Sequence, residues 1–189
     1  METSRSGTHF LGQLKTDTVA NCIGATPLVR LNRVPASLGI KAQVYAKLEY
    51  FNAGGSVKDR IAKRMIEKAE QNGIIKPGDT LIEASSGNTG SGRLDTGRGA
   101  HRLSRLHHQR GAWRLQKEIP HSHILDQYTN PENPAAHEFG TAEERWYQTD
   151  GKVDVVISGA GTGGTVTGTS RGLKKHSPDT LVVGAGKVY

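Results

Sequence analysis

Lys58 is the residue of this sequence whose position most favours chemistry. It lies in residues 52–60, Asn-Ala-Gly-Gly-Ser-Val-Lys-Asp-Arg, which follow an apolar stretch and start a predicted helix. The positive end of the helix dipole disfavours an ammonium group in the first turn, and burial would lower the lysine pKa further. A lysine that is partly neutral can attack a carbonyl and form a Schiff base. The simpler interpretation of this position alone is a lysine that stays in water.

A glycine-rich segment, residues 158–165, lies between a predicted strand and the start of a predicted helix. Its glycines let the backbone approach a phosphate, and helix amides and threonine hydroxyls supply donors. Gly159, Gly161 and Gly164 also fit the dinucleotide pattern G-x-G-x-x-G. That pattern needs an acidic residue about 20 positions further on, where this chain has Gly-Ala-Gly at 184–186. We therefore favour a phosphate site over a dinucleotide site, and a purely structural turn is a third option.

A polar loop, residues 85–90 with the sequence Ser-Ser-Gly-Asn-Thr-Gly, follows a predicted strand. Such a loop can present several N–H and O–H donors to a carboxylate, although taken alone it is more often an ordinary turn. An amine, a phosphate site and a carboxylate-binding loop together match pyridoxal phosphate. That cofactor needs an imine lysine and a phosphate site, and its substrates are amino acids.

Composition narrows the possible classes of protein. One cysteine, Cys22, among 189 residues excludes an internal disulfide framework and favours a reducing compartment. We find no secretory signal and no stretch as long as a membrane span, so we expect a cytoplasmic protein without a membrane partner.

Most of the net charge of +7 falls in residues 91–114, which show no folded nucleic-acid-binding pattern. We expect no nucleic-acid partner, and a basic interaction segment is the alternative. The histidines at 101, 107 and 108 lack a nearby carboxylate pair or cysteine, so no metal is expected.

The elements that must position these residues alternate between strands and helices. Strands are predicted at 27–32, 43–49, 80–84, 153–158 and 180–183, and helices at 56–72, 113–119, 134–147 and 165–175. Ser56 should cap the first helix with Asp59 as its capping-box partner, and Ile61, Met65 and Ala69 should form its buried face. Residues 91–111 show no period of 2 or 3.6, so they predict neither helix nor strand. The alternation predicts an α/β fold with a parallel sheet.

Five segments of the chain resemble the fold type II pyridoxal-phosphate enzymes of the tryptophan-synthase-β type, and among them the cystathionine β-synthases. These segments are residues 48–61, 76–80, 85–90, 123–128 and 161–165. The resemblance covers roughly residues 20–90 and 112–184. It implies twisted parallel sheets with flanking helices, incomplete in this chain.

The resemblance also implies a role for each matching residue. Lys58 would be the catalytic lysine that carries the Schiff base to pyridoxal 5′-phosphate, and Asn88 would hydrogen-bond the ring hydroxyl of that cofactor. The phosphate would be held by Gly161, Thr162, Gly163, Gly164 and Thr165. The carboxylate of the substrate would be bound by Ser85, Ser86, Thr89 and Gln127, with Tyr128 near the substrate.

The reaction implied by the resemblance is β-replacement on serine with homocysteine, which gives cystathionine in the transsulfuration route to cysteine. A cysteine synthase that uses sulfide and an activated serine is one alternative, and a nucleotide-binding module built on residues 159–164 is another. A homodimer is possible because the family commonly dimerises. No haem is expected, because the N-terminus lacks the Cys/His segment that binds haem in some relatives.

The chain departs from the family pattern in ways that imply impaired activity. We expect a flexible N-terminus at 1–19 and a partial catalytic domain at 20–184, with a truncated end at 185–189. Residues 91–111 interrupt this domain with a basic string where the family has a helix, a strand and another helix. A reading-frame or splicing error would account for that string.

Overall fold

Three small sheets organise the part of the chain described by the structure, a computed structural model that describes residues 16–84, 102–106 and 109–186. An antiparallel pair contains β1 (Leu28–Leu31) and β2 (Val44–Lys47). A parallel sheet has the order β4 (Arg102–Leu106), β3 (Thr80–Ala84) and β5 (Ser122–His123). A second parallel pair contains β6 (Val155–Gly159) and β7 (Leu181–Ala185).

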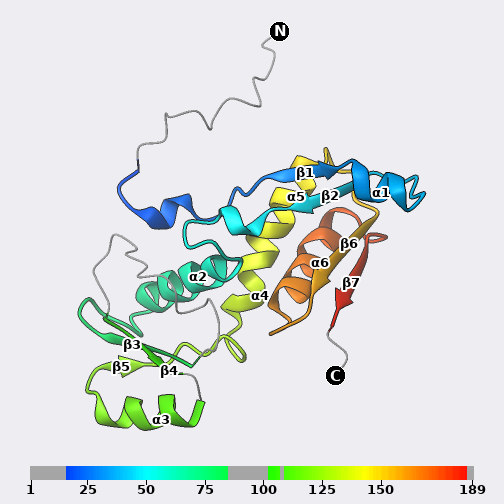
Figure 1. The fold of residues 1–189 in the computed structure, drawn as a ribbon. Coiled ribbons are helices and arrows are strands. Elements are labelled where there is room, and N and C mark those ends of the chain that lie inside the picture. Colours follow the sequence, from blue (N-terminus) through cyan, green and yellow to red (C-terminus); the bar gives the residue numbers. More distant parts are fainter. Residues whose placement is uncertain (1–15, 85–101, 107–108, 187–189) are drawn as a thin grey trace.

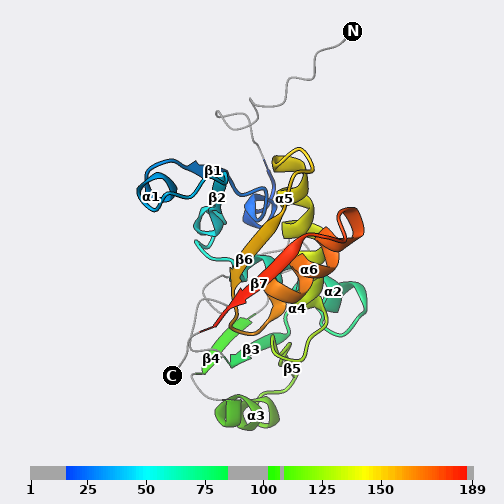
Figure 2. The same ribbon diagram turned by 90° about the vertical axis from the view of Figure 1, so that its right-hand side faces the viewer.

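Helices and short helical turns connect these strands. The α-helices are α1 (Arg33–Ser37), α2 (Lys58–Gln71), α3 (Gln109–Glu118), α4 (Glu132–Ala136), α5 (Ala142–Gln148) and α6 (Gly164–His176). A π-helical turn, η4 (His137–Thr141), joins α4 to α5, and two 3-10 turns are η1 (Val19–Cys22) and η2 (Glu49–Phe51). In Figure 1, α4 and α5 run through the middle of the molecule, with α2 on one side and α6 followed by β6 and β7 on the other. Figure 2 shows the β6–β7 pair at the front of the turned view, next to α6.

The start of α2 is held by a variant of the predicted capping box: Asp59 accepts from the N–H of Ser56 as expected, but Ser56 Oγ accepts from the N–H of Lys58 and not from that of Asp59. The helix begins at Lys58, whose backbone N–H donates to Ser56 Oγ at 3.2 Å. The Asp59 carboxylate reaches back and accepts from the N–H of Ser56 at 3.3 Å and of Gly54 at 2.7 Å. Donors that the first helical turn cannot satisfy are thereby paired. The capping box fixes the backbone on both sides of Lys58.

The apolar face predicted for α2 is confirmed. Ile61, Met65 and Ala69 are buried. Ile61 and Met65 pack against Ala136 of α4, whereas Ala69 belongs to a second cluster that includes Leu81 of β3. The helix therefore bridges the sheet and the central helix through apolar contacts on one face.

The helix predicted at 134–147 is present, but its interior face is only partly correct. The sequence predicts five interior residues: Ala135, Ala136, Phe139, Ala142 and Trp146. Phe139 is 57% exposed, so that assignment is wrong. The cause is the π turn η4, in which the N–H of Ala142 donates to the carbonyl of His137 five residues earlier. A π turn shifts the faces of a helix, and Phe139 lies at the surface beneath the cations of Arg64 and Lys175.

The parallel sheet forms from other strands than the sequence predicts. The strand–helix–strand order of residues 43–84 predicts that the strands at 43–49 and 80–84 belong to one parallel sheet. Instead β2 pairs antiparallel with β1, and β3 pairs with β4 and β5. β4 arises within residues 91–111, where no element is predicted, because the hydrogen bonds of β3 supply a pairing that no local pattern encodes. Residues 1–15, 85–101, 107–108 and 187–189 lie outside the described residues.

The strand predicted as buried at 153–158 is buried on one face only. In β6, Val156 and Ser158 are buried, whereas Val155 is 53% and Ile157 68% exposed. The period-2 geometry of a strand places these two pairs on opposite faces, and α6 covers only one of them. None of the described helices is long and apolar enough to cross a membrane.

Glycines at four-residue spacing allow α6 to pack closely on the central helix. A Cβ at Gly168 would overlap the Pro134 carbonyl oxygen and lie 2.7 Å from His137 Cβ. A Cβ at Gly172 would overlap the Ala142 side chain. Both glycines are fully helical, so the constraint here is space and not backbone conformation.

We expect Gly168→Ala to lower the free energy of unfolding by about 2–3 kcal/mol, because α6 must move away from the carbonyl of Pro134. Gly184→Ala in β7 is the control, since a Cβ there meets only ordinary contacts at 3.7 Å. Urea denaturation followed by circular dichroism measures both. Equal stability of the two variants would contradict the close packing.

Candidate active site

The amine of Lys58 lies against the glycine-rich segment. Lys58 Nζ donates a hydrogen bond to Thr162 Oγ1 at 3.4 Å, although the two residues are 104 positions apart in the sequence. Lys58 comes from the first turn of α2, and Thr162 from the turn between β6 and α6. The fold thus brings the predicted nucleophile to the predicted phosphate site.

The surroundings of Lys58 favour its neutral form. The side chain is half-buried, and this burial lowers the pKa of its ammonium group. The carboxylate of Glu83 acts in the opposite direction but is the smaller effect, so the pKa stays below its ordinary value. A lysine with a lowered pKa has a larger neutral fraction near pH 7 and is a better nucleophile.

The glycine-rich segment has the geometry of an anion site at a helix start. Gly163 precedes α6 with a φ of 83°, a left-handed conformation that glycine adopts without strain. Gly161 and Gly163 have open space where a Cβ would lie. The N–H groups at the start of α6 and the hydroxyls of Thr162 and Thr165 are the donors available to an anion there.

Gly164 differs from the other glycines of this segment because it abuts a side chain. A Cβ at Gly164 would overlap the amide of Asn133, which is 2% exposed. The Asn133 Nδ2 group donates to Thr162 Oγ1 at 3.0 Å and to the carbonyl oxygen of Gln127 at 2.6 Å. Asn133 therefore connects the glycine-rich segment to the loop that contains Gln127.

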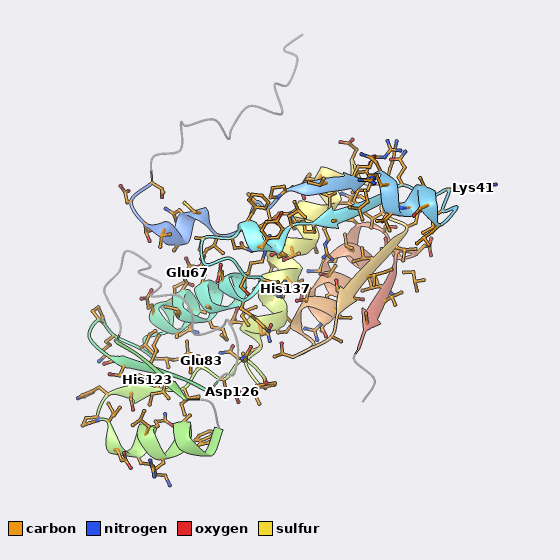
Figure 3. The ribbon with its side chains drawn as sticks, viewed as in Figure 1. Lys41, Glu67, Glu83, His123, Asp126 and His137 are labelled. Atoms are coloured by element: carbon orange, nitrogen blue, oxygen red, sulfur yellow. The ribbon has the colours of Figure 1, made fainter. Side chains whose placement is uncertain are left out.

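His137 lies in the π turn η4 between α4 and α5 (Figure 3). Its Nε2 is 3.3 Å from Thr165 Oγ1, and its Nδ1 is 2.9 Å from Thr141 Oγ1. Burial, reinforced by the positive charge of Arg60, lowers the pKa of His137 to about 4. The imidazole is therefore neutral at physiological pH and hydrogen-bonds the Thr165 hydroxyl without adding charge.

Gln127 and Tyr128, the neighbouring residues predicted to contact the substrate, have different surroundings. Gln127 is buried, and its Nε2 donates to Glu83 Oε1 at 3.2 Å. Tyr128 is 60% exposed, and its backbone N–H donates to Asp126 Oδ1. Burial, with the nearby charge of Asp126, raises the pKa of Glu83, and Figure 3 shows these two carboxylates near one another. Gln127 thus hydrogen-bonds the carboxylate of Glu83, and Lys58 interacts electrostatically with that same carboxylate.

Ser85, Ser86, Asn88 and Thr89, the other residues assigned to cofactor and substrate, lie outside the described residues. Their roles stay predictions. In the sequence they follow β3 directly, and Glu83 of this strand interacts with both Gln127 and Lys58.

Sequence reasoning missed Asn133, His137 and Glu83. Glu83 and His137 are single polar residues in a predicted strand and a predicted helix, and Asn133 directly precedes that helix; a solvent-exposed position is the usual expectation for all three. The one available signal was position, because Glu83 lies two residues before the predicted carboxylate loop and His137 falls within the predicted helix at 134–147.

A buried ion cluster anchors the helix that carries Lys58. Arg60 donates to Glu49 Oε2 at 2.6 Å and to Glu144 Oε1 at 2.6 Å. Lys47 also donates to Glu144, and the N–H of Ala25 donates to Glu144 Oε1 at 2.8 Å. The cluster joins α2, β2 and α5 two residues from Lys58.

The charge of Glu144 depends on these partners. Burial alone would raise its pKa, but hydrogen bonds from Arg60 and Lys47 outweigh burial and lower the pKa to about 2, against an ordinary value of 4.5. The unfolded chain therefore takes up this proton at a higher pH than the folded chain. The stabilisation is complete above pH 4.5 and is lost as the pH falls toward 2.

We expect Glu144→Gln to be less stable than the wild type at neutral pH, and to lose less stability than the wild type between pH 4.5 and pH 2. Glu143→Gln on the same helix is the control. It removes a carboxylate that contacts His176 outside the cluster and should keep the wild-type pH dependence. Chemical denaturation at a series of pH values measures this. An unchanged slope in Glu144→Gln would show that the cluster does not hold Glu144 charged.

Comparison with known proteins supports the resemblance seen in the sequence. The family described as "Pyridoxal-phosphate dependent enzyme" matches residues 19–93 and 97–188. Cystathionine beta-synthase of Rattus norvegicus is 46% identical over 86% of this chain and 35% of its own length. The Dictyostelium discoideum protein of the same name is 44% identical over 91% of this chain and 41% of its own length. Cysteine synthase of Staphylococcus aureus (strain N315) is 39% identical over 92% of this chain and 65% of its own length.

A solved structure agrees with the fold. The crystal structure of O-ureido-L-serine synthase aligns with a TM-score of 0.78 and 31% identity, over 90% of this chain and 63% of that chain. The chain spans about a third of the length of the rat protein and less than two thirds of the solved one. With a family match over most of its length and a shared fold, the chain belongs to the pyridoxal-phosphate-dependent enzymes of fold type II.

Proposed function

We propose that this chain is part of a lyase that uses pyridoxal phosphate to replace the β-hydroxyl of serine with homocysteine, giving cystathionine. One observation carries the proposal: Lys58 Nζ lies 3.4 Å from Thr162 Oγ1 of the glycine-rich segment. An amine of lowered pKa beside an anion site is what an aldehyde with a phosphate group requires.

The described residues fit this cofactor. Gly161 and Gly163 leave open space beside the start of α6, and Thr162 and Thr165 offer hydroxyls there. The positive end of the α6 dipole favours the phosphate dianion. When bound, the cofactor would supply an electron-withdrawing ring that stabilises negative charge on the α-carbon of the substrate.

The residues of the chain would divide the remaining work. Lys58 would bind the cofactor aldehyde and, once the amino group of the substrate has displaced it, would take the α-proton on Nζ. Gln127 would donate to the substrate carboxylate, and Glu83 would hold the Gln127 amide by the hydrogen bond at 3.2 Å. Ser85, Ser86 and Thr89 would supply further donors to that carboxylate, with Tyr128 near the substrate, and Asn88 would bind the ring hydroxyl of the cofactor.

The choice of serine and homocysteine rests on the relatives. Proteins named cystathionine beta-synthase are 44–46% identical to the chain in rat and Dictyostelium discoideum, and the Staphylococcus aureus protein named cysteine synthase is 39% identical. The chain covers 35–41% of the first two, so turnover belongs to the whole protein. We expect the chain alone to bind the cofactor and to turn over slowly.

We expect borohydride reduction of the chain with pyridoxal phosphate to fix the cofactor on Lys58, and Lys58→Arg to abolish both this label and the visible absorbance of the imine. Turnover, where it is measurable, should fall by at least about a hundredfold because the base is lost. Peptide mapping by mass spectrometry locates the label. Lys68→Arg, on the same helix with its amine on Gln71, is the matched control and should label as the wild type does. A label on another lysine of the folded wild type would refute the assignment.

The substrates are tested with the cofactor-loaded chain. With L-serine and homocysteine we expect cystathionine, detected by mass spectrometry. Production of cysteine from sulfide and O-acetylserine, without cystathionine from serine and homocysteine, would instead favour the cysteine synthase alternative.

A further inference from the structure

Asn133 occupies a position that neither the sequence motifs nor the proposed chemistry assigns. It lies in α4 and is 2% exposed. Its Nδ2 contacts two loops at once: the glycine-rich segment at Thr162 Oγ1, 3.0 Å away, and the substrate loop at the carbonyl oxygen of Gln127, 2.6 Å away. A carbonyl oxygen can only accept, so the Gln127 contact identifies Nδ2 as the donor and fixes the orientation of the amide.

The Oδ1 atom of the same amide is closely packed against Gly164. It is buried without a hydrogen-bond partner among the described residues. It occupies the space that a Cβ of residue 164 would need, so Gly164 is what admits Asn133. An unpaired buried carbonyl is costly. The two hydrogen bonds that Nδ2 donates offset part of this cost.

The consequence falls on the Thr162 hydroxyl. A hydroxyl oxygen accepts two hydrogen bonds and donates one. Thr162 Oγ1 accepts from Asn133 Nδ2 at 3.0 Å and from Lys58 Nζ at 3.4 Å. Both lone pairs are thereby used, so the hydroxyl proton is left to donate in the remaining direction.

We propose that Asn133 is a positioning residue that holds the Thr162 hydroxyl as a donor toward a bound phosphate and ties it to the loop of Gln127. The proposal rests on the proposed function, because it takes the glycine-rich segment as the phosphate site. Asn133 itself touches neither phosphate nor substrate. It acts through Thr162, and the same amide keeps the two loops in register.

A double-mutant cycle tests the proposal with inorganic phosphate as the probe and the cofactor-free chain as the protein. We compare the wild type, Asn133→Ala, Thr162→Val and the double variant, and measure phosphate affinity by titration calorimetry. Each single variant should bind phosphate about tenfold more weakly, because a donor to a charged group is lost or misdirected. The double variant should be no weaker than Thr162→Val alone, since Asn133 acts only through the hydroxyl.

Other outcomes would overturn the proposal. These are a double variant about a hundredfold weaker than the wild type, an unchanged affinity in Asn133→Ala, and a folded wild type that binds no phosphate. Asn133→Asp keeps the side-chain size and replaces the donor with an acceptor, so it serves if Asn133→Ala does not fold, and it should also weaken phosphate binding. Asn130→Asp is the control, because Asn130 Nδ2 donates to the carbonyl of Leu125 in the same loop and does not contact Thr162; it should retain wild-type affinity.

The double-mutant cycle tests the role of Asn133, and the labelling of Lys58 tests the proposed function, so a negative result in one does not decide the other. Labelling at Lys58 together with additive effects in the cycle would overturn the role of Asn133 and leave the proposed function standing. A non-additive cycle without labelling at Lys58 would leave a positioned phosphate site and remove the enzyme assignment.

Discussion

The close packing of α6 on the central helix is the constraint from which the site follows. Gly168 and Gly172 leave no room for a Cβ between α6 and residues 134–142, so the two helices approach backbone to backbone. This contact sets where α6 begins, and hence where Thr162 and Gly163 lie. From this position Thr162 contacts both Asn133 and Lys58.

Buried ion pairs fix the start of α2, the helix that carries Lys58. Arg60 lies two residues after Lys58 and is buried among Glu49 and Glu144. These two carboxylates offset the cost of burying the Arg60 guanidinium and keep it charged. Removing either carboxylate would leave part of that buried charge uncompensated. Burial has a different result at Lys58, where the charge of Glu83 offsets it only in part and the pKa is lowered. Two basic residues in one helical turn thus have different roles: Arg60 stays charged and anchors the helix, whereas Lys58 has the larger neutral fraction that a nucleophile needs.

The described part of the chain also has apolar surface that the fold does not cover. Val155 and Ile157 of β6, with Leu181 and Val183 of β7, are exposed on the face away from α6. Parallel sheets are normally covered on both faces. The chain spans 35% of the length of the rat protein and 41% of that of the Dictyostelium discoideum protein.

Local patterns were sufficient for several elements and for the identity of the reacting groups. The capping box at Ser56 and Asp59, the apolar face of α2 and the turn before α6 follow from short-range rules, because each depends on residues within a few positions of one another. Phe139 was misplaced because a π turn shifts the helical period without a signal in the sequence. β4 was missed because its pairing with β3 is a long-range backbone interaction.

The sequence by itself therefore determined which groups can react: an amine at a helix start and a glycine-rich segment at another. Only the tertiary structure decided that they meet, that Glu83 faces Lys58 and Gln127, and that Asn133 holds Thr162. The physical reason is that reactivity depends on residue type and local backbone, whereas proximity depends on helix packing across more than a hundred residues. The space left by Gly164 and Gly168 sets that packing.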